Sequence, residues 1–168
     1  MDILPDGSLD LPDSLLEEFD FVVASIHSRF NQDNTYRILK AMENPFVNLI
    51  GHPTGKAYGT RQGYPLYMER IIQMAKETNT ALELNTYRAD LSPENIRRCM
   101  EVGVMIAVVT DAHSTKHLFY MELGVGLAEV IKCWCSLGQF SFFAEISMSM
   151  SPMVSFLLLR LPASSMFS

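Results

Sequence analysis

The sequence predicts an α/β fold in which parallel strands alternate with helices. Short runs of valine, isoleucine and leucine alternate along the chain with segments whose apolar residues recur at helical spacing. A run of β-branched and apolar residues, 104–114, stops at Thr110-Asp111-Ala112-His113, which is typical of a buried strand with polar residues at its carboxyl end. A barrel and a doubly wound sheet both fit this order.

The first half of the chain contains three predicted strands and two predicted helices. Turn residues close the strands, with Pro5-Asp6-Gly7 after the first and Gly51 after the third. Asp10 is a suitable N-cap for the first helix, and Asn44-Pro45 ends the second. The strands are residues 1–4, 21–26 and 46–50, and the helices are residues 11–18 and 33–43.

The second half continues the alternation. The glycine-rich loop 53–65 carries Lys56 and Arg61 and no acidic residue, so its local charge is positive. Ser92-Pro93 is a typical helix start and Gly103 a typical helix end. The strands are residues 81–84 and 104–114, and the helices are residues 66–77, 93–102 and a last segment up to 132 that Gly-Val-Gly at 124–126 interrupts, as a turn or a place of close packing.

Composition limits the classes of function. With 168 residues, 48% of them hydrophobic, one folded domain is expected. The net charge of −6 excludes a broad cationic surface for nonspecific binding of nucleic acid. The three cysteines are an odd number and form no Cys-x-x-Cys motif, which favours a reducing cytoplasm over secretion. The acidic first ten residues do not resemble a signal peptide. We expect no membrane span, and the sequence leaves the oligomeric state open.

The segment 133–168 differs from the rest of the chain. Glu145 and Arg160 are its only charged residues, and its serine-rich apolar runs follow neither helical nor strand periodicity. We therefore expect the domain to cover residues 1–132 and to be followed by a tail of low charge that does not belong to it. A contact with a subunit or a membrane surface is the alternative for this tail.

Polar residues gather at the predicted carboxyl ends of four strands, which meet at one edge of a parallel sheet. Imidazole and carboxylate together suit zinc, manganese or iron, and such ions bind phosphoester oxygens and generate hydroxide. Lys56 and Arg61 are candidates for holding a phosphate, with a solvated loop as the alternative. Asn85 either faces the site, where it is a third candidate for holding the phosphate, or caps a turn. His117 is expected to be a solvated helix residue. The candidate metal ligands are His27, His52, Asp111 and His113.

Four motifs in succession resemble the polymerase and histidinol phosphatase (PHP) domain, most closely that of bacterial and archaeal family X DNA polymerases. They are Ser25-Ile26-His27-Ser28, Gly51-His52-Pro53-Thr54-Gly55, Glu83-Leu84-Asn85 and Thr110-Asp111-Ala112-His113-Ser114. The resemblance covers residues 1–132. It implies a distorted, TIM-like seven-stranded (β/α)7 barrel with up to three divalent ions, of which His27 and His52 bind one, Asp111 a second and His113 a third.

The resemblance also implies an activity. In polymerase-linked members this is 3′-to-5′ exonuclease and DNA end processing in repair, and in free-standing members it is hydrolysis of a small phosphate ester such as histidinol phosphate. The family pattern opens with a His-x-His strand and a bridging glutamate, neither of which precedes Asp2-Ile3-Leu4 here. We therefore expect about five of the seven strands, a chain truncated at its N-terminus and weak metal binding. An inactive remnant is the third possibility.

Overall fold

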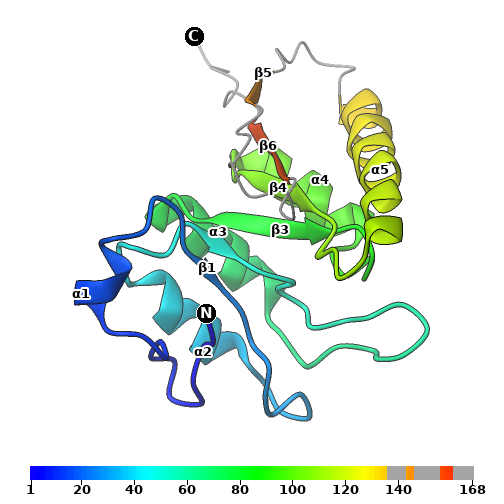
Figure 1. Cartoon of the computed structure of the whole chain (residues 1–168). Helices are drawn as coiled ribbons and strands as arrows, with labels where there is room; N and C mark the ends of the chain where they lie inside the picture. The colour runs from blue at the N-terminus through cyan, green and yellow to red at the C-terminus, as the bar shows by residue number, and fades with distance from the viewer. Residues whose placement is uncertain (136–142, 146–155, 161–168) are drawn as a thin grey trace, which may run out of the picture.

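The computed structural model describes residues 1–135, 143–145 and 156–160, and their centre is a six-stranded sheet (Figure 1). Its strand order is β1-β2-β3-β4-β6-β5, and the first four strands are parallel. This confirms the predicted α/β class with parallel strands. The described strands form an open sheet, so the TIM-like barrel stays a prediction. The strands are β1 (Val23–Ala24), β2 (Leu49–Ile50), β3 (Ala81–Asn85), β4 (Ile106–Val109), β5 (Phe143–Glu145) and β6 (Phe156–Arg160).

Helices connect the parallel strands, and neighbouring helices along the chain, from the second to the fifth, contact one another. Every residue of β3 is buried, as expected for a parallel strand covered on both faces. The helices are α1 (Asp13–Leu16), α2 (Thr35–Met42), α3 (Met68–Thr78), α4 (Pro93–Val102), the 3-10 helix η1 (Thr115–Phe119) and α5 (Tyr120–Cys135).

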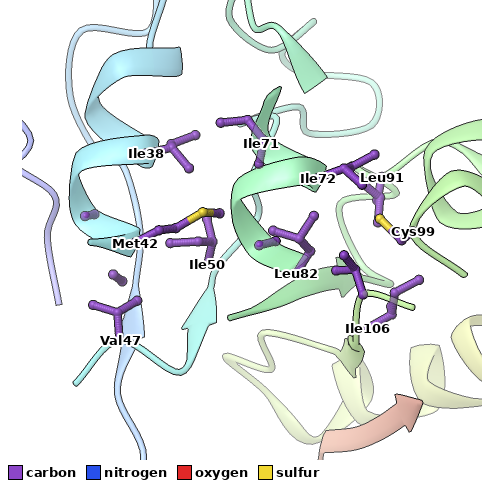
Figure 2. Close-up of a cluster of buried hydrophobic side chains, with 14 of the residues drawn as sticks. Ile38, Met42, Val47, Ile50, Ile71, Ile72, Leu82, Leu91, Cys99 and Ile106 are labelled. Carbon is purple, nitrogen blue, oxygen red and sulfur yellow. The ribbon is translucent and has the colours of Figure 1, made fainter. Parts of the chain in front are cut away.

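One apolar cluster joins the helices to the sheet, as Figure 2 shows. Ile38 of α2, Ile71 of α3 and Cys99 of α4 belong to the same buried cluster as Leu82 of β3 and Ile106 of β4. Burial of such side chains stabilises the fold by about 1.5–3 kcal/mol each. The cluster holds the strands in place, and with them the residues at their carboxyl ends.

Two predicted helix ends are confirmed and one is wrong. The hydroxyl of Ser92 accepts a hydrogen bond from the Asn95 backbone N–H at 3.2 Å, and Gly103 ends α4 with a φ of 83°. Asp10 does not cap the first helix, because α1 begins after Pro12. The Asp10 carboxylate instead accepts a hydrogen bond from the backbone N–H of Asp2 at 2.9 Å.

The predicted first strand is reduced to a short contact. Asp2 forms an isolated parallel bridge with Ser25, and the Ile3 backbone N–H donates to the Ser25 carbonyl at 2.8 Å. These contacts place the first residues along the outer edge of β1.

The predicted interruption at residues 124–126 is wrong, because α5 is continuous from Tyr120 to Cys135. The other predicted role of this segment, close packing, is confirmed at Gly124. A Cβ atom there would lie 2.0 Å from Thr86 Cγ2 and 2.7 Å from Val108 Cγ1. The absence of a side chain therefore lets α5 approach the end of β4 and the loop after β3.

We predict that Gly124→Ala lowers the free energy of unfolding by about 1 kcal/mol or more, since the added methyl group collides with Thr86 and Val108. Gly126→Ala is the matched control, because among the described residues no atom beyond its own stretch of helix lies within 4 Å of a Cβ at that position. Alanine there should be neutral or stabilising by roughly 0.5–1 kcal/mol through helix propensity. Urea unfolding followed by circular dichroism measures both variants, and equal effects would contradict the packing role of Gly124.

The predicted tail is described only in part. Helix α5 continues past residue 132 to Cys135, and β6 pairs antiparallel with β4, with Leu158 opposite Ala107. β5 pairs antiparallel with β6. The other residues of the predicted tail lie outside the described residues, and the domain boundary at 132 stays a prediction. Within the described residues no helix is both long enough and apolar enough to cross a membrane.

Candidate functional site

His27 and His52 follow the neighbouring strands β1 and β2, and the structure brings their rings together. The ring centroids are 5.3 Å apart at an interplanar angle of 73°. His27 is exposed, and its Nδ1 lies 3.4 Å from a carboxylate oxygen of Asp2, which also accepts the His27 backbone N–H at 3.3 Å. Two imidazoles predicted to share an edge of the sheet therefore lie in contact.

His52 is held in a buried, strained position. Its side chain is 5% exposed, its φ is 32°, and its backbone N–H donates to the carboxylate of Glu83. Burial, followed by the positive charge of Arg88, lowers the pKa of His52 to about 4. The ring is therefore neutral near pH 7, and its Nδ1 has no hydrogen-bond partner among the described residues.

Glu83 organises the loop that carries His52. Glu83 belongs to the sequence motif Glu83-Leu84-Asn85, but sequence reasoning gave it no role in the site. Its second carboxylate oxygen accepts a hydrogen bond from Asn85 Nδ2 at 3.0 Å. Burial, with the negative charge of Asp90 as the next cause, raises the pKa of Glu83 to about 8. A Cβ at Gly51 would lie 2.7 Å from the Ser25 hydroxyl and 3.1 Å from Glu83, so glycine permits this approach. The sequence does carry a signal for a functional role of Glu83, because it is an ionisable residue inside the apolar run Ala-Leu-Glu-Leu.

Asp111 and His113 follow β4, as predicted. One carboxylate oxygen of Asp111 accepts hydrogen bonds from Arg88 Nε at 3.0 Å and Nη2 at 2.8 Å. His113 Nδ1 lies 2.7 Å from the Asp111 carbonyl oxygen, and the His113 side chain is 73% exposed. The charge of Asp111 raises the pKa of both His52 and Glu83, although it is a lesser cause in each case. The charge of Asp111 therefore reaches His52 and Glu83.

Asn85 and Asp90 form the buried support beneath this site. Asn85 is fully buried, and its side-chain oxygen accepts the Arg88 backbone N–H at 3.0 Å, which is the predicted turn-capping alternative. Asp90, which sequence reasoning missed, accepts the Asn85 backbone N–H at 3.1 Å. Its other carboxylate oxygen has no partner among the described residues. Burial raises the pKa of Asp90 to about 7.

The basic loop between β2 and α3 lies against the loop after β3, because the Tyr58 backbone N–H donates to the Arg88 carbonyl at 3.0 Å. Its Arg61 guanidinium lies 4.0 Å from the centre of the Phe30 ring and donates to the Gly55 carbonyl at 2.5 Å. Lys56 is half-buried. The phosphate-binding roles of Lys56, Arg61 and Asn85 stay predictions.

The donors at the site fit part of a metal centre. Within the part of the chain that the structure describes, no three histidine, cysteine, aspartate or glutamate side chains are grouped to hold a metal ion. His27 and His52 do bring two imidazoles together, and the buried Nδ1 of His52 lacks a hydrogen-bond partner among the described residues. This pair fits two ligands of one zinc-like or manganese-like ion. The three-ion set stays a prediction.

Comparison with known proteins finds bacterial relatives. The chain is 46% identical over 133 residues to the DNA polymerase/3′-5′ exonuclease PolX of Bacillus subtilis, a match that covers 76% of this chain and 23% of that protein. It is 35% identical over 120 residues to a probable phosphatase of Clostridium novyi and 37% identical over 123 residues to one of Caldicellulosiruptor saccharolyticus. Each of these two matches covers 64% of this chain.

The chain spans less than half the length of these relatives: 23% of the polymerase, and 47% and 48% of the two phosphatases. No family model matches the chain. The relatives agree with the resemblance to the PHP domain that the sequence motifs carry, and they suggest a phosphoesterase-type domain.

Proposed function

We propose that this chain carries a metal-dependent phosphoesterase site that acts on the 3′ ends of DNA. The observation that carries the proposal is the contact between His27 and His52 at the carboxyl edge of the sheet, where the charge of Asp111 also acts. The similarity to a protein named as a 3′-5′ exonuclease supports this choice of reaction. The relatives of this chain that are named as probable phosphatases support phosphoester hydrolysis more generally.

The proposed reaction is hydrolysis of the last phosphodiester. A water oxygen bonds to phosphorus while the bond from phosphorus to the 3′ oxygen of the preceding nucleotide breaks, and one water proton ends on that oxygen. The products are a nucleoside 5′-monophosphate and a shortened strand with a 3′ hydroxyl. A divalent ion of manganese, zinc or iron held by His27 and His52 would supply positive charge for the phosphoryl oxygens and acidify water.

The protein's own groups have separate tasks in this proposal. Glu83 holds the backbone of His52, which aims a neutral imidazole into the site. Arg88 orients the Asp111 carboxylate through two hydrogen bonds to one oxygen. The positive charge of Lys56 and Arg61 in the neighbouring loop attracts the phosphate backbone, which a chain of net charge −6 would otherwise repel.

Hydrolysis of a small phosphate ester is the second candidate, which the relatives named as probable phosphatases favour. One pair of assays on the full chain with manganese separates the two functions: digestion of a 5′-labelled oligonucleotide with a recessed 3′ end, and release of phosphate from histidinol phosphate. We expect digestion of the oligonucleotide. Phosphate release alone would favour the second function, and an inert chain would contradict both.

We predict that His52→Ala and Asp111→Asn each lower the rate of digestion by roughly 10–100-fold or more, as expected when a metal site loses a ligand or its support. Asp20→Asn is the matched control, since Asp20 is exposed and precedes β1, whereas His27 follows that strand. Circular dichroism verifies that each variant is folded. Wild-type rates in folded His52→Ala and Asp111→Asn would overturn the proposed site.

A further inference from the structure

Three aromatic rings form a cluster beside the candidate site, and neither the sequence motifs nor the proposed chemistry use them. Tyr87, from the loop after β3, stacks on His117 of η1 with a centroid distance of 4.4 Å and an interplanar angle of 15°. Tyr120, at the start of α5, meets Tyr87 edge-on at 5.3 Å and 67°. We call Tyr87, His117 and Tyr120 the aromatic surface.

The aromatic surface is partly open to solvent. Tyr87 is 47% exposed, although its ring is already packed against His117 and Tyr120. Stacking with His117 fixes the plane of the Tyr87 ring, so its exposed part is preorganised. A tyrosine that only filled the core would be buried instead. His117, predicted to be a solvated helix residue, is half-buried under this ring.

Direct contacts connect the aromatic surface to the candidate site. The next residue after Tyr87 is Arg88, whose guanidinium pairs with Asp111. The backbone N–H of His113 donates to His117 Nδ1 at 3.3 Å, and the two rings are 6.4 Å apart. Gly124 lets the start of α5 pack against the loop that carries Tyr87 (Figure 1). A ligand on Tyr87 would therefore lie beside Asp111 and His113.

The surroundings combine positive charge with further exposed rings. Lys116 directly precedes His117 and is exposed, and Arg88, whose guanidinium is paired with Asp111, follows Tyr87. The loop of Tyr58, a residue that is 78% exposed, is tied to Arg88 through its backbone N–H. Phe119, on the same short helix as His117, is 74% exposed. Cations interleaved with exposed aromatic rings are the arrangement that binds single-stranded nucleic acid, since bases stack on the rings and phosphates pair with the cations.

We propose that Tyr87, supported by His117, is the stacking site for an unpaired base at the 3′ end of a nucleic acid. The substrate class of the site is then a strand end with a free base, in preference to a small phosphate ester without an aromatic ring. This inference rests on the proposed phosphoesterase function, which it makes more specific. Because every base has an aromatic face, the site accepts all four bases.

Binding in EDTA tests the inference separately from hydrolysis. The probe is a 5′-fluorescein-labelled duplex with one unpaired 3′ thymidine, and its partner probe carries an abasic residue at that position. We expect the full chain to bind the thymidine probe more tightly, and Tyr87→Leu to weaken that binding by about 10-fold while leaving the abasic probe unchanged. Tyr36→Leu is the matched control, since Tyr36 is 66% exposed on α2.

The outcomes separate the inference from the function on which it rests. Equal affinity of the wild type for the two probes, or an equal loss for both in Tyr87→Leu, overturns the stacking site even if the oligonucleotide is digested with manganese. Base-dependent binding without digestion supports the stacking site and counts against the phosphoesterase. Circular dichroism excludes unfolding as the cause, and replacement of the thymidine by adenosine should change the affinity little.

Discussion

Arg37→Met is expected to lower the free energy of unfolding by about 3–5 kcal/mol. Arg37 on α2 is only 2% exposed, and its guanidinium makes five hydrogen bonds. It donates to the carbonyls of Ile3, Leu4 and Ser28, at 3.0 Å for Leu4 and 2.9 Å for Ser28. It also reaches the Asn34 side-chain oxygen at 2.9 Å. Methionine fills a similar volume but removes these hydrogen bonds, and the acceptors on the buried Ile3 and Asn34 lose the guanidinium as a partner.

The loss of stability in Arg37→Met should extend to the candidate functional site. The segments that Arg37 joins flank Asp2 and His27, whose side chains contact each other. Urea unfolding followed by circular dichroism gives the change in stability. Arg70→Met is the matched control, because Arg70 is exposed on α3, and its effect should stay within about 0.5 kcal/mol. A loss below about 1 kcal/mol in Arg37→Met would show that these bonds are replaceable.

Between pH 6.5 and 8, the free energy of unfolding is expected to fall by about 2 kcal/mol as pH rises. Burial raises the pKa of Glu83 to about 8 and that of Asp90 to about 7. In the unfolded chain both carboxyls are ionised throughout this window, so the folded state binds more protons. The stability that the protonated carboxyls contribute is complete below about pH 4 and is lost as pH rises through 7 and 8.

His52 acts in the opposite direction at lower pH. Its pKa is lowered to about 4, so the unfolded chain takes up the proton first as pH falls below 6.5, and stability is lost there. Above pH 6.5 the carboxyls dominate, because the His52 imidazole of the unfolded chain is at most half protonated there. Urea unfolding at several pH values measures the slope, which Glu83→Gln should reduce and which Glu18→Gln, an exposed control, should leave intact. An unchanged slope in Glu83→Gln would contradict the raised pKa.

Local sequence was sufficient where neighbouring residues determine the structure. The alternation of apolar runs and helical spacing predicted parallel strands, and Ser92 and Gly103 marked the ends of α4 because caps act on the adjacent turn. His27 and His52 were expected at one edge because parallel strands end together. Local sequence failed to predict the role of Gly124. A glycine can interrupt a helix or permit close packing of a continuous one, and only the contact with Thr86 on another segment distinguishes these two roles.

By itself, then, the sequence determined the class of fold, the edge of the sheet that carries the polar residues, and the types of donor found there. The tertiary structure alone decided that Arg37 is buried, that Glu83 holds His52, that Arg88 pairs with Asp111, and that Tyr87 stacks on His117. The physical reason is the distance along the chain over which each interaction acts. Periodicity and capping act within a few residues, whereas each of these pairs depends on the register and packing of segments far apart in the chain.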